Sequence, residues 1–220
     1  MGFKQLNKFI YLILIFIIYT KYIYIKMEHW IEDIPSAVKG HRKFIEWLVK
    51  YVNPKTIVEL GVDYGYSTFV FSNALPYGLN NRVYSIDWFK GDESTGYRNT
   101  RKEVEDLIIE HKIDNVVIVQ GDFNEIVTVW SKEIDILFID GSHDYNSVLN
   151  DFCEWSRYVG KDGVILMHDT NIEEFGVKKL FSDIEGYYKL EFLHSAGLGI
   201  LLTNKELHDT IENLFFNVPF

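Results

Sequence analysis

The sequence predicts an α/β protein with a doubly wound, mostly parallel sheet of seven strands that ends in an antiparallel hairpin. Two observations carry this prediction. Short apolar runs alternate with amphipathic segments from residue 56 to residue 184, as expected for a series of βα units. Near the C-terminus, two extended segments, residues 188–193 and 199–203, are separated by a turn too short for a parallel connection.

The first βα unit is centred on residues 56–68, where an apolar run reaches Glu59 and is followed by Gly61 and Gly65 before a helix begins. Glycine adopts positive φ at little cost and lets a ligand approach the backbone. The spacing is G-x-x-x-G, with Asp63 where a dinucleotide-binding fingerprint would have glycine, which argues against a nicotinamide dinucleotide. A helix over residues 39–52, with apolar side chains at helical spacing, is predicted to precede this unit.

The remaining elements follow from the same alternation. Helices are predicted over residues 67–75, 100–111, 123–130, 145–159 and 177–184, and strands over residues 82–87, 116–120, 134–140 and 163–168. Gly160 and Gly163 are expected to bracket the turn before the last of these strands. Residues 88–97 form a polar and aromatic loop that is longer than most βα connections, and loops of that kind are usually functional.

Composition limits the kinds of partner. The chain has 220 residues with 47% hydrophobic content, enough for one substantial core. Its formal charge is -10 and no basic stripe is interleaved with aromatic residues, which argues against a nucleic-acid partner. The single cysteine, Cys153, excludes an intrachain disulfide and a multi-cysteine metal site, and its apolar neighbours predict a core position.

Residues 9–25 are almost wholly apolar, which favours an uncleaved membrane anchor, although a span usually needs about 20 such residues. The alternative is that Met27 is the true start. The expected organisation is therefore an apolar segment, residues 1–26, followed by a catalytic domain, residues 27–220. With the segment present we expect a membrane-associated protein with a cytoplasmic catalytic domain, and without it a cytoplasmic protein.

Polar side chains follow the predicted strands at their carboxyl ends. Asp87 lies roughly 20 residues beyond the glycine loop, where doubly wound folds place the carboxylate that holds a ribose. Asp140 and His143 follow the fourth strand, and His168-Asp169 ends the fifth. In open α/β sheets these ends share one crevice, and carboxylates converging there suit Mg²⁺ or Mn²⁺. The alternative is that these are ordinary polar loops that cap the following helices.

Glu59 and Gly61 after the first strand, Asp87 after the second and Gly121-Asp122 after the third together resemble the class I S-adenosylmethionine-dependent methyltransferases, which have a Rossmann-like fold. The resemblance implies that the region of Glu59 and Gly61 contacts the methionine moiety, Asp87 the ribose, and Gly121-Asp122 the adenine. The cofactor-binding residues expected on this basis are Glu59, Gly61, Asp63, Gly65, Ser67, Asp87, Trp88, Asp122 and Asp140.

The run from residue 134 to residue 145, together with His168-Asp-Thr-Asn171, is similar to a small branch of that class associated with glycans and natural products, including sugar O-methyltransferases. The similarity extends over most of residues 56–203. It implies that Asp140 and the pair at 168–169 hold a metal and that His143 is the catalytic base, assisted by Asp140. This chain departs from the branch at His168, where the pair begins with a carboxylate in the relatives.

The expected function is O-methylation of a hydroxylated small molecule or a sugar or glycan, with S-adenosylmethionine as methyl donor and assistance by Mg²⁺ or Mn²⁺. Two alternatives are a non-catalytic protein that binds S-adenosylmethionine and an NAD(P)-dependent oxidoreductase. The expected partner is the acceptor itself. Self-association into a homo-oligomer is compatible with the sequence.

Overall fold

The computed structural model describes residues 29–76, 80–91 and 96–217. The chain divides into two compact units, residues 1–35 and Ser36–Phe220. In the first unit, residues 29–33 are helical. The second unit contains the sheet and every residue that the sequence predicts to be functional.

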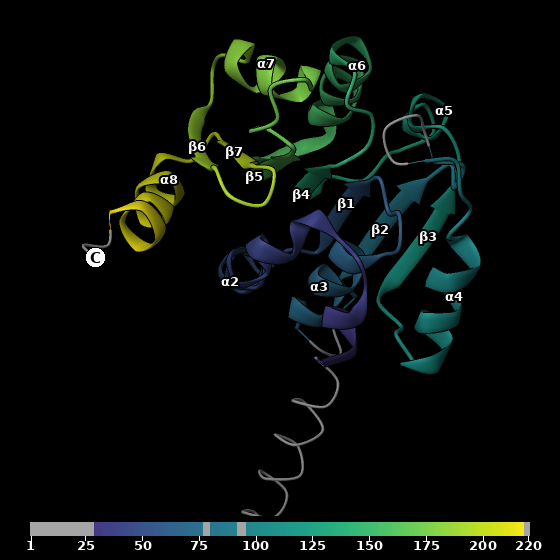
Figure 1. Ribbon diagram of the computed structural model, residues 1–220. Coiled ribbons are helices and arrows are strands. Elements are labelled where there is room, and N and C mark those ends of the chain that lie inside the picture. Colours follow the sequence, from purple (N-terminus) through teal and green to yellow (C-terminus); the bar gives the residue numbers. More distant parts are fainter. Residues whose placement is uncertain (1–28, 77–79, 92–95, 218–220) are drawn as a thin grey trace, which may run out of the picture. The chain divides into compact units, whose positions relative to one another are not determined.

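The second unit is built on a seven-stranded sheet with the order β3-β2-β1-β4-β5-β7-β6. Strands β1 to β5 are parallel to one another, whereas β7 is antiparallel to both β5 and β6. This confirms the predicted doubly wound sheet and its closing hairpin (Figure 1). The strands are β1 (Thr56–Leu60), β2 (Arg82–Asp87), β3 (Val116–Gln120), β4 (Ile134–Ile139), β5 (Val159–His168), β6 (Tyr188–Phe192) and β7 (Leu198–Leu202).

Helices cover both faces of the sheet. Helices α2, α3 and α4 lie on one side, and α5, α6 and α7 on the other (Figure 1). Within these layers α2 packs against α3, and α6 packs against both α5 and α7. Their bounds are α2 (Arg42–Val52), α3 (Tyr66–Ala74), α4 (Arg101–Glu110), α5 (Phe123–Val127), α6 (Tyr145–Trp155) and α7 (Gly176–Asp183).

The central strands are buried because helices cover them on both faces. Four consecutive residues of β1, from Ile57 to Leu60, are buried, and so are the last six residues of β5. Continuous apolar runs of this kind are typical of parallel strands covered on both sides. The core between β4, β5 and helices α6 and α7 includes Leu137, Trp155, Ile165 and Leu180, and it fixes the strand ends that carry the site.

The predicted helix over residues 145–159 was wrong at its end. Helix α6 ends at Trp155, a 3₁₀ turn covers Ser156–Tyr158, and β5 begins at Val159. The turn expected between Gly160 and Gly163 is a bulge inside β5, because Ile134 pairs with Val159 and Ile136 pairs with Val164. The extra residues belong to β5 and do not pair with β4 at this point, as in other β-bulges.

Several smaller elements differ from the prediction. The helix expected over residues 39–52 is a 3₁₀ segment, Ala37–His41, followed by α2, which ends at Val52. Its C-cap Asn53 has φ of 53°, and Pro54 cannot continue the helix. Two C-terminal helical segments, α8 (Lys205–Ile211) and a π-helix (Glu212–Phe216), were not predicted. Cys153 was predicted in the core but is exposed, because it lies on the outer face of α6.

The apolar segment at residues 9–25 lies outside the described residues, so the anchor and the domain boundary at residue 26 stay predictions. Within the described part of the chain, no helix has the length and apolar character needed to cross a membrane.

Candidate active site

The carboxyl ends of β1, β2, β4 and β5 meet at one edge of the sheet, as predicted. Backbone hydrogen bonds continue past the strand ends: the Gly61 amide donates to Ile86 O at 2.9 Å, and the Asp140 amide donates to Leu60 O at 2.8 Å. These two bonds therefore hold the loops that carry Gly61 and Asp140 against the neighbouring strand ends.

The two glycines of the first loop are required by geometry. Gly61 has φ of 97°, and a Cβ there would lie 2.1 Å from the carbonyl oxygen of Asp140. Gly65 has φ of 84° and precedes α3, and its Cβ would lie 2.9 Å from the Phe69 ring. Any side chain at Gly61 would push the first and fourth strand ends apart.

Asp87 fastens the glycine loop. Its Oδ2 accepts hydrogen bonds from the Val62 amide at 2.7 Å and the Asp63 amide at 3.3 Å, and its Oδ1 accepts from the Phe89 amide at 2.6 Å. Each carboxylate oxygen can accept two hydrogen bonds, so Oδ1 retains capacity for a further donor such as a ribose hydroxyl. The ribose contact itself stays a prediction.

Asp63 has a partner that the sequence analysis missed. Its carboxylate accepts a bidentate pair of hydrogen bonds from Arg98, Nε to Oδ1 at 2.9 Å and Nη2 to Oδ2 at 2.8 Å. The guanidinium of Arg98 also lies 5.2 Å from the centroid of the Tyr64 ring, and Thr100 Oγ1 donates to the carbonyl of Asp63. The Asp63 carboxylate, which the sequence predicts to bind the cofactor, therefore pairs with Arg98 and helps to hold the glycine loop from its exposed side.

Glu59 is fully buried beneath that loop. Its Oε2 accepts hydrogen bonds from Ser85 at 2.6 Å and from Thr68, whereas Oε1 has no hydrogen-bond partner among the described residues. Burial raises the pKa of Glu59 to about 7, although the hydroxyls of Ser67, Ser85 and Thr68 oppose the shift and Asp140 adds to it. Ser67, expected to bind the cofactor, is buried beside this carboxylate.

Two residues of the expected cofactor set lie farther along the edge. Trp88 is 43% exposed and its carbonyl accepts a hydrogen bond from Gln120 Nε2 at 3.2 Å. Asp122 caps α5 by accepting from the Asn124 amide at 2.8 Å. Burial, with a smaller contribution from Asp122, raises the pKa of Asp151 on α6 to about 7. The structure assigns Asp122 a capping role, and its adenine contact stays a prediction.

The ends of β4 and β5 bring together all four predicted catalytic and metal-binding side chains. His168 Nδ1 lies 3.1 Å from Asp140 Oδ1 and 3.3 Å from Asp169 Oδ1, and His143 Nε2 lies 2.8 Å from Asp169 Oδ2. Asp140, His168 and Asp169 each offer one donor atom within 4.8 Å of the others. The His143 ring stacks on Phe175 with ring centroids 4.0 Å apart.

The pKa values of this cluster are strongly linked. Burial opposes the charged form of His168, but Asp140 and Asp169 outweigh it and raise the pKa of His168 to about 11. Burial alone would raise the pKa of Asp169, yet hydrogen bonds from His143 and His168 hold this pKa well below the usual range. For Asp140, burial outweighs the attraction of His168 and raises its pKa. Without a bound cation, His168 is therefore the positive charge between two carboxylates.

The loop between β6 and β7 supports the cluster and was not predicted to do so. Ser195 and Ala196 have φ values of 51° and 68°, and the Ser195 carbonyl lies 3.0 Å from His168 Nε2 and 3.3 Å from His41 Nε2. Burial, together with His194 and His168, lowers the pKa of His41 to about 4, so this ring is neutral. The run His-Ser-Ala-Gly at 194–197 is the only sequence signal that marks this loop.

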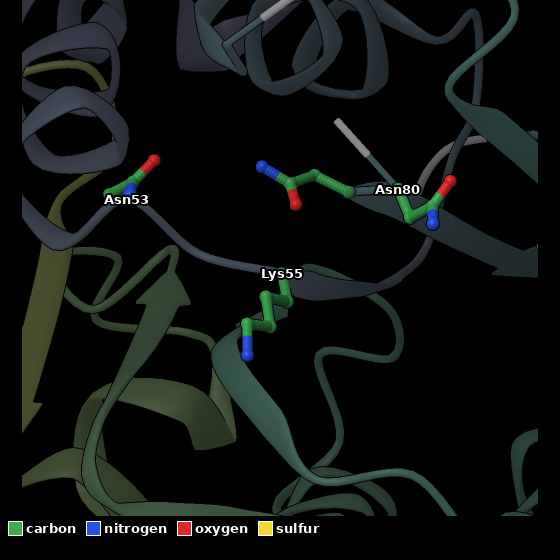
Figure 2. Close-up of a pocket in the computed structure, with 4 residues that line it drawn as sticks. Asn53, Lys55 and Asn80 are labelled. Carbon is green, nitrogen blue, oxygen red and sulfur yellow. The ribbon is translucent and has the colours of Figure 1, made fainter. Parts of the chain in front are cut away.

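A pocket at the opposite edge of the sheet is unrelated to this cluster. It is lined by Asn53, Lys55, Asn80 and Asn81 (Figure 2). Lys55 and Asn81 immediately precede β1 and β2, so the pocket lies at the amino ends of the strands. In doubly wound sheets ligands bind at the carboxyl ends, where the cluster lies.

Comparison with known proteins identifies the family. Residues 58–170, about half of the chain, match the family described as a methyltransferase domain (Methyltransf_24). The chain is 32% identical over 190 residues to the uncharacterized protein y4gI of Sinorhizobium fredii. The aligned region covers 83% of this chain and 21% of that protein. It is also 34% identical over 94 residues to an uncharacterized protein of Acanthamoeba polyphaga mimivirus, covering 37% of this chain and 42% of the relative. The chain thus spans less than half the length of these curated relatives.

Solved structures share the fold. A putative caffeoyl-CoA O-methyltransferase from Staphylococcus aureus superposes with a TM-score of 0.62 at 18% identity, covering 79% of this chain and 87% of that one. The O-methyltransferase TomG from Streptomyces achromogenes, solved with S-adenosylmethionine, has a TM-score of 0.60 at 14% identity, covering 80% and 89%. The matched family and the shared fold show that the chain belongs to the methyltransferase-domain family and has a Rossmann-like fold.

Proposed function

We propose that the chain methylates a hydroxyl group of a small molecule or glycan, with His143 as the base. The observation that carries this proposal is the contact between His143 Nε2 and Asp169 Oδ2 at 2.8 Å, beside Asp140 at the carboxyl edge of the sheet. A carboxylate can only accept a hydrogen bond, so Nε2 donates, and in the neutral ring the lone pair lies on Nδ1. Asp169 thus fixes the tautomer and orientation of a base.

The residues around the glycine loop suit the cofactor. The Oε1 atom of Glu59 is buried and without a partner among the described residues, and the ammonium group of a methionine moiety would satisfy it. Gly61 keeps side-chain atoms away from the point where the loop meets Asp140. Asp87 holds the loop and retains capacity for a ribose hydroxyl. These features support cofactor binding by Glu59, Gly61 and Asp87.

A base is needed because a neutral hydroxyl is a weak nucleophile. S-adenosylmethionine supplies a methyl group on a positively charged sulfur, which leaves as a neutral thioether when the methyl moves to the acceptor oxygen. The chain must then align the acceptor and remove its proton. His143, held between Phe175 and Asp169, is placed to accept that proton.

Asp140, His168 and Asp169 have the donor types and spacing of a divalent cation site. These three residues would hold the ion, and such an ion would lower the pKa of a nearby acceptor hydroxyl. Asp169 could serve both groups, because its Oδ1 faces His168 while its Oδ2 faces His143.

A sugar-like or aromatic acceptor is supported by the rings next to the cluster. The His41 ring lies 5.9 Å from both His168 and Phe192 and stacks on His194 with centroids 4.6 Å apart. His194 is exposed, and Phe192 is partly so. Rings of this kind offer flat surfaces to the face of a hydroxylated ring.

The test is methyl transfer from labelled S-adenosylmethionine to a panel of hydroxylated acceptors, including glycans, with the product identified by mass spectrometry. We expect the gain of one methyl on oxygen, and a loss of about 10²–10⁴ in kcat for His143→Ala with cofactor affinity retained. His111→Ala, at the end of α4, is the matched control and should be fully active.

Two outcomes would contradict the proposal. Methylation at nitrogen or carbon would reject the acceptor class, and full activity of His143→Ala would reject the base. Cofactor binding without turnover of any acceptor would favour the alternative of a non-catalytic binding protein. The family assignment already favours methyl transfer over the oxidoreductase alternative.

A further inference from the structure

We infer that His168 makes the candidate cation site selective for first-row transition ions, of the series from Mn²⁺ to Zn²⁺, over Mg²⁺. This inference rests on the proposed metal site and goes beyond it by naming the class of ion. It concerns the donor set, in which one imidazole nitrogen lies between two carboxylate oxygens: His168 Nδ1 is 3.1 Å from Asp140 Oδ1 and 3.3 Å from Asp169 Oδ1.

The spacing of these atoms fits adjacent positions around one ion. In an octahedral site with donors about 2.1 Å from the metal, neighbouring donors lie roughly 3 Å apart. Without an ion, the protonated ring donates a hydrogen bond from Nδ1 to Asp140 Oδ1 at 3.1 Å, and a bound ion would take the place of that proton. A cation between the three atoms would satisfy both carboxylates at once.

The ring of His168 is held in the orientation that a ligand needs. Its Nε2 lies 3.0 Å from the carbonyl oxygen of Ser195, and because a carbonyl only accepts, Nε2 carries the proton. In the neutral ring Nδ1 then presents its lone pair to the two carboxylates. A backbone carbonyl on the second nitrogen is the usual support of a metal-binding histidine.

The Ser195 carbonyl is itself fixed by the fold. The Asp169 amide donates to Gly197 O at 3.1 Å, and the Asn171 amide donates to Ala196 O at 2.9 Å. These bonds tie the left-handed turn at Ser195 and Ala196 to the loop that follows β5. The position of His168 is therefore set by backbone on both sides, as a preorganised ligand requires.

The donor types then decide between ions. Mg²⁺ prefers oxygen donors and gives up its water reluctantly, whereas imidazole nitrogen suits first-row transition ions. Replacing one carboxylate with imidazole also removes one negative charge from the site. Both effects weaken the binding of Mg²⁺ more than the binding of an ion such as Co²⁺ or Mn²⁺.

The experiment uses the full chain, freed of metal with a chelator, and titrates it with MnCl₂, CoCl₂ and MgCl₂ by calorimetry, with the visible absorption of Co²⁺ as a second readout. We expect one site that binds Co²⁺ and Mn²⁺ at least about tenfold more tightly than Mg²⁺. His168→Glu should reduce this preference several-fold by restoring an all-oxygen site. Equal or tighter binding of Mg²⁺ by the unmodified protein would overturn the inference, as would a preference that His168→Glu leaves unchanged.

A control distinguishes this site from the half-buried group His208, Asp209 and Glu212, whose donor atoms are also close together. Asp209→Asn should leave the Co²⁺ spectrum unchanged, and its disappearance in that variant would place the ion on α8 and overturn the inference. Absence of any bound ion would also overturn it, leaving His168 as a fixed cation between the carboxylates. Because these measurements need no acceptor, they separate a failure of the ion assignment from a failure of the proposed methyl transfer.

Discussion

The carboxyl edge of the sheet contains two regions that place carboxylates by different means. At β1 and β2, Glu59 and Asp87 accept hydrogen bonds from hydroxyls and backbone amides. At β4 and β5, Asp140 and Asp169 face the imidazoles of His168 and His143. The first region is a set of acceptors fixed by hydrogen bonds, which we propose binds the cofactor, whereas the second is a network in which each group affects the charge of the next.

Both regions contain left-handed backbone. In the first region Asp63 and Phe89 have φ of 47° and 56°, beside the two left-handed glycines of the loop. In the second region Asp169, Ser195 and Ala196 all have positive φ with a side chain present. Such residues cost about 1–3 kcal/mol each and persist only where surrounding contacts hold them. Both regions therefore depend on surrounding contacts to hold backbone positions that are costly on their own.

The largest effect should come from Asp169, which joins His143 to His168. Asp169→Asn removes a charge from the cation site and offers His143 an amide in place of a carboxylate, which disturbs its tautomer. We expect kcat to fall by about 10²–10⁴ while the Kd for S-adenosylmethionine changes less than about threefold. Asp183→Asn, the same change on the surface of α7, should have wild-type kinetics. A kcat within about threefold of wild type for Asp169→Asn would remove the network from the mechanism.

The reverse pattern is expected in the first region. Asp87→Ala removes the acceptor for the amides of Val62 and Asp63, and leaving the amide of the buried residue Val62 without a partner costs about 1–3 kcal/mol. We expect the calorimetric Kd for S-adenosylmethionine to rise tenfold or more, with kcat at saturating cofactor less affected. Asp87→Asn keeps one acceptor oxygen and should weaken binding less. Undiminished cofactor affinity in Asp87→Ala would contradict the assignment of this region.

Sequence patterns predicted these regions unequally. The strands, the hairpin and the four strand ends follow from apolar periodicity and from the rule that parallel strands end at a common edge, whereas the strand order comes from the structure. Gly61 and Gly65 could be identified because few other residues adopt their backbone geometry. His168 and Asp169 were predicted to converge with Asp140 and His143, and the structure adds that Asp169 contacts both histidines.

The parts that were missed depend on contacts between distant segments. Arg98 reaches Asp63 across 35 positions of the sequence, and the Ser195 carbonyl reaches His168 across 27. A carbonyl oxygen has no sequence signature, and an arginine in a polar loop has many potential partners. The bulge in β5 was missed because Gly160 and Gly163 are equally compatible with a turn between two elements.

A smaller, pH-dependent effect should come from Glu59. Its pKa is raised from the ordinary 4.5 to about 7 by burial, so the folded protein binds more protons than the unfolded chain between these values. The free energy of unfolding should therefore fall as pH rises from about 4.5 to 7. The charged form suits the cofactor ammonium, so cofactor affinity should rise over pH 6 to 8. Glu59→Gln should flatten both curves and weaken binding about fivefold at pH 8, as measured by calorimetry and thermal unfolding.

The smallest effect should come from Arg98, which holds the first loop from its exposed side. The side chains of Arg98 and Asp63 are 31% and 48% exposed, so water and salt screen the pair. Exposed ion pairs contribute about 0.2–1 kcal/mol, which corresponds to a change of less than about fivefold. We expect Arg98→Gln to raise the KM for S-adenosylmethionine by about two- to fivefold at low salt, with kcat unchanged and the difference reduced at high salt.

Arg157→Gln is the matched control, because Arg157 forms a surface ion pair with Glu154 at the end of α6 and lies outside the loop. This variant should leave the KM unchanged, so a KM effect specific to Arg98 would show that the pair acts on the cofactor loop and not on general stability. Equal effects of the two variants would assign the pair to surface electrostatics alone. A fall in kcat for Arg98→Gln would contradict the separation between a cofactor-binding region and a catalytic region. The first region would then be coupled to the chemistry that we place at β4 and β5.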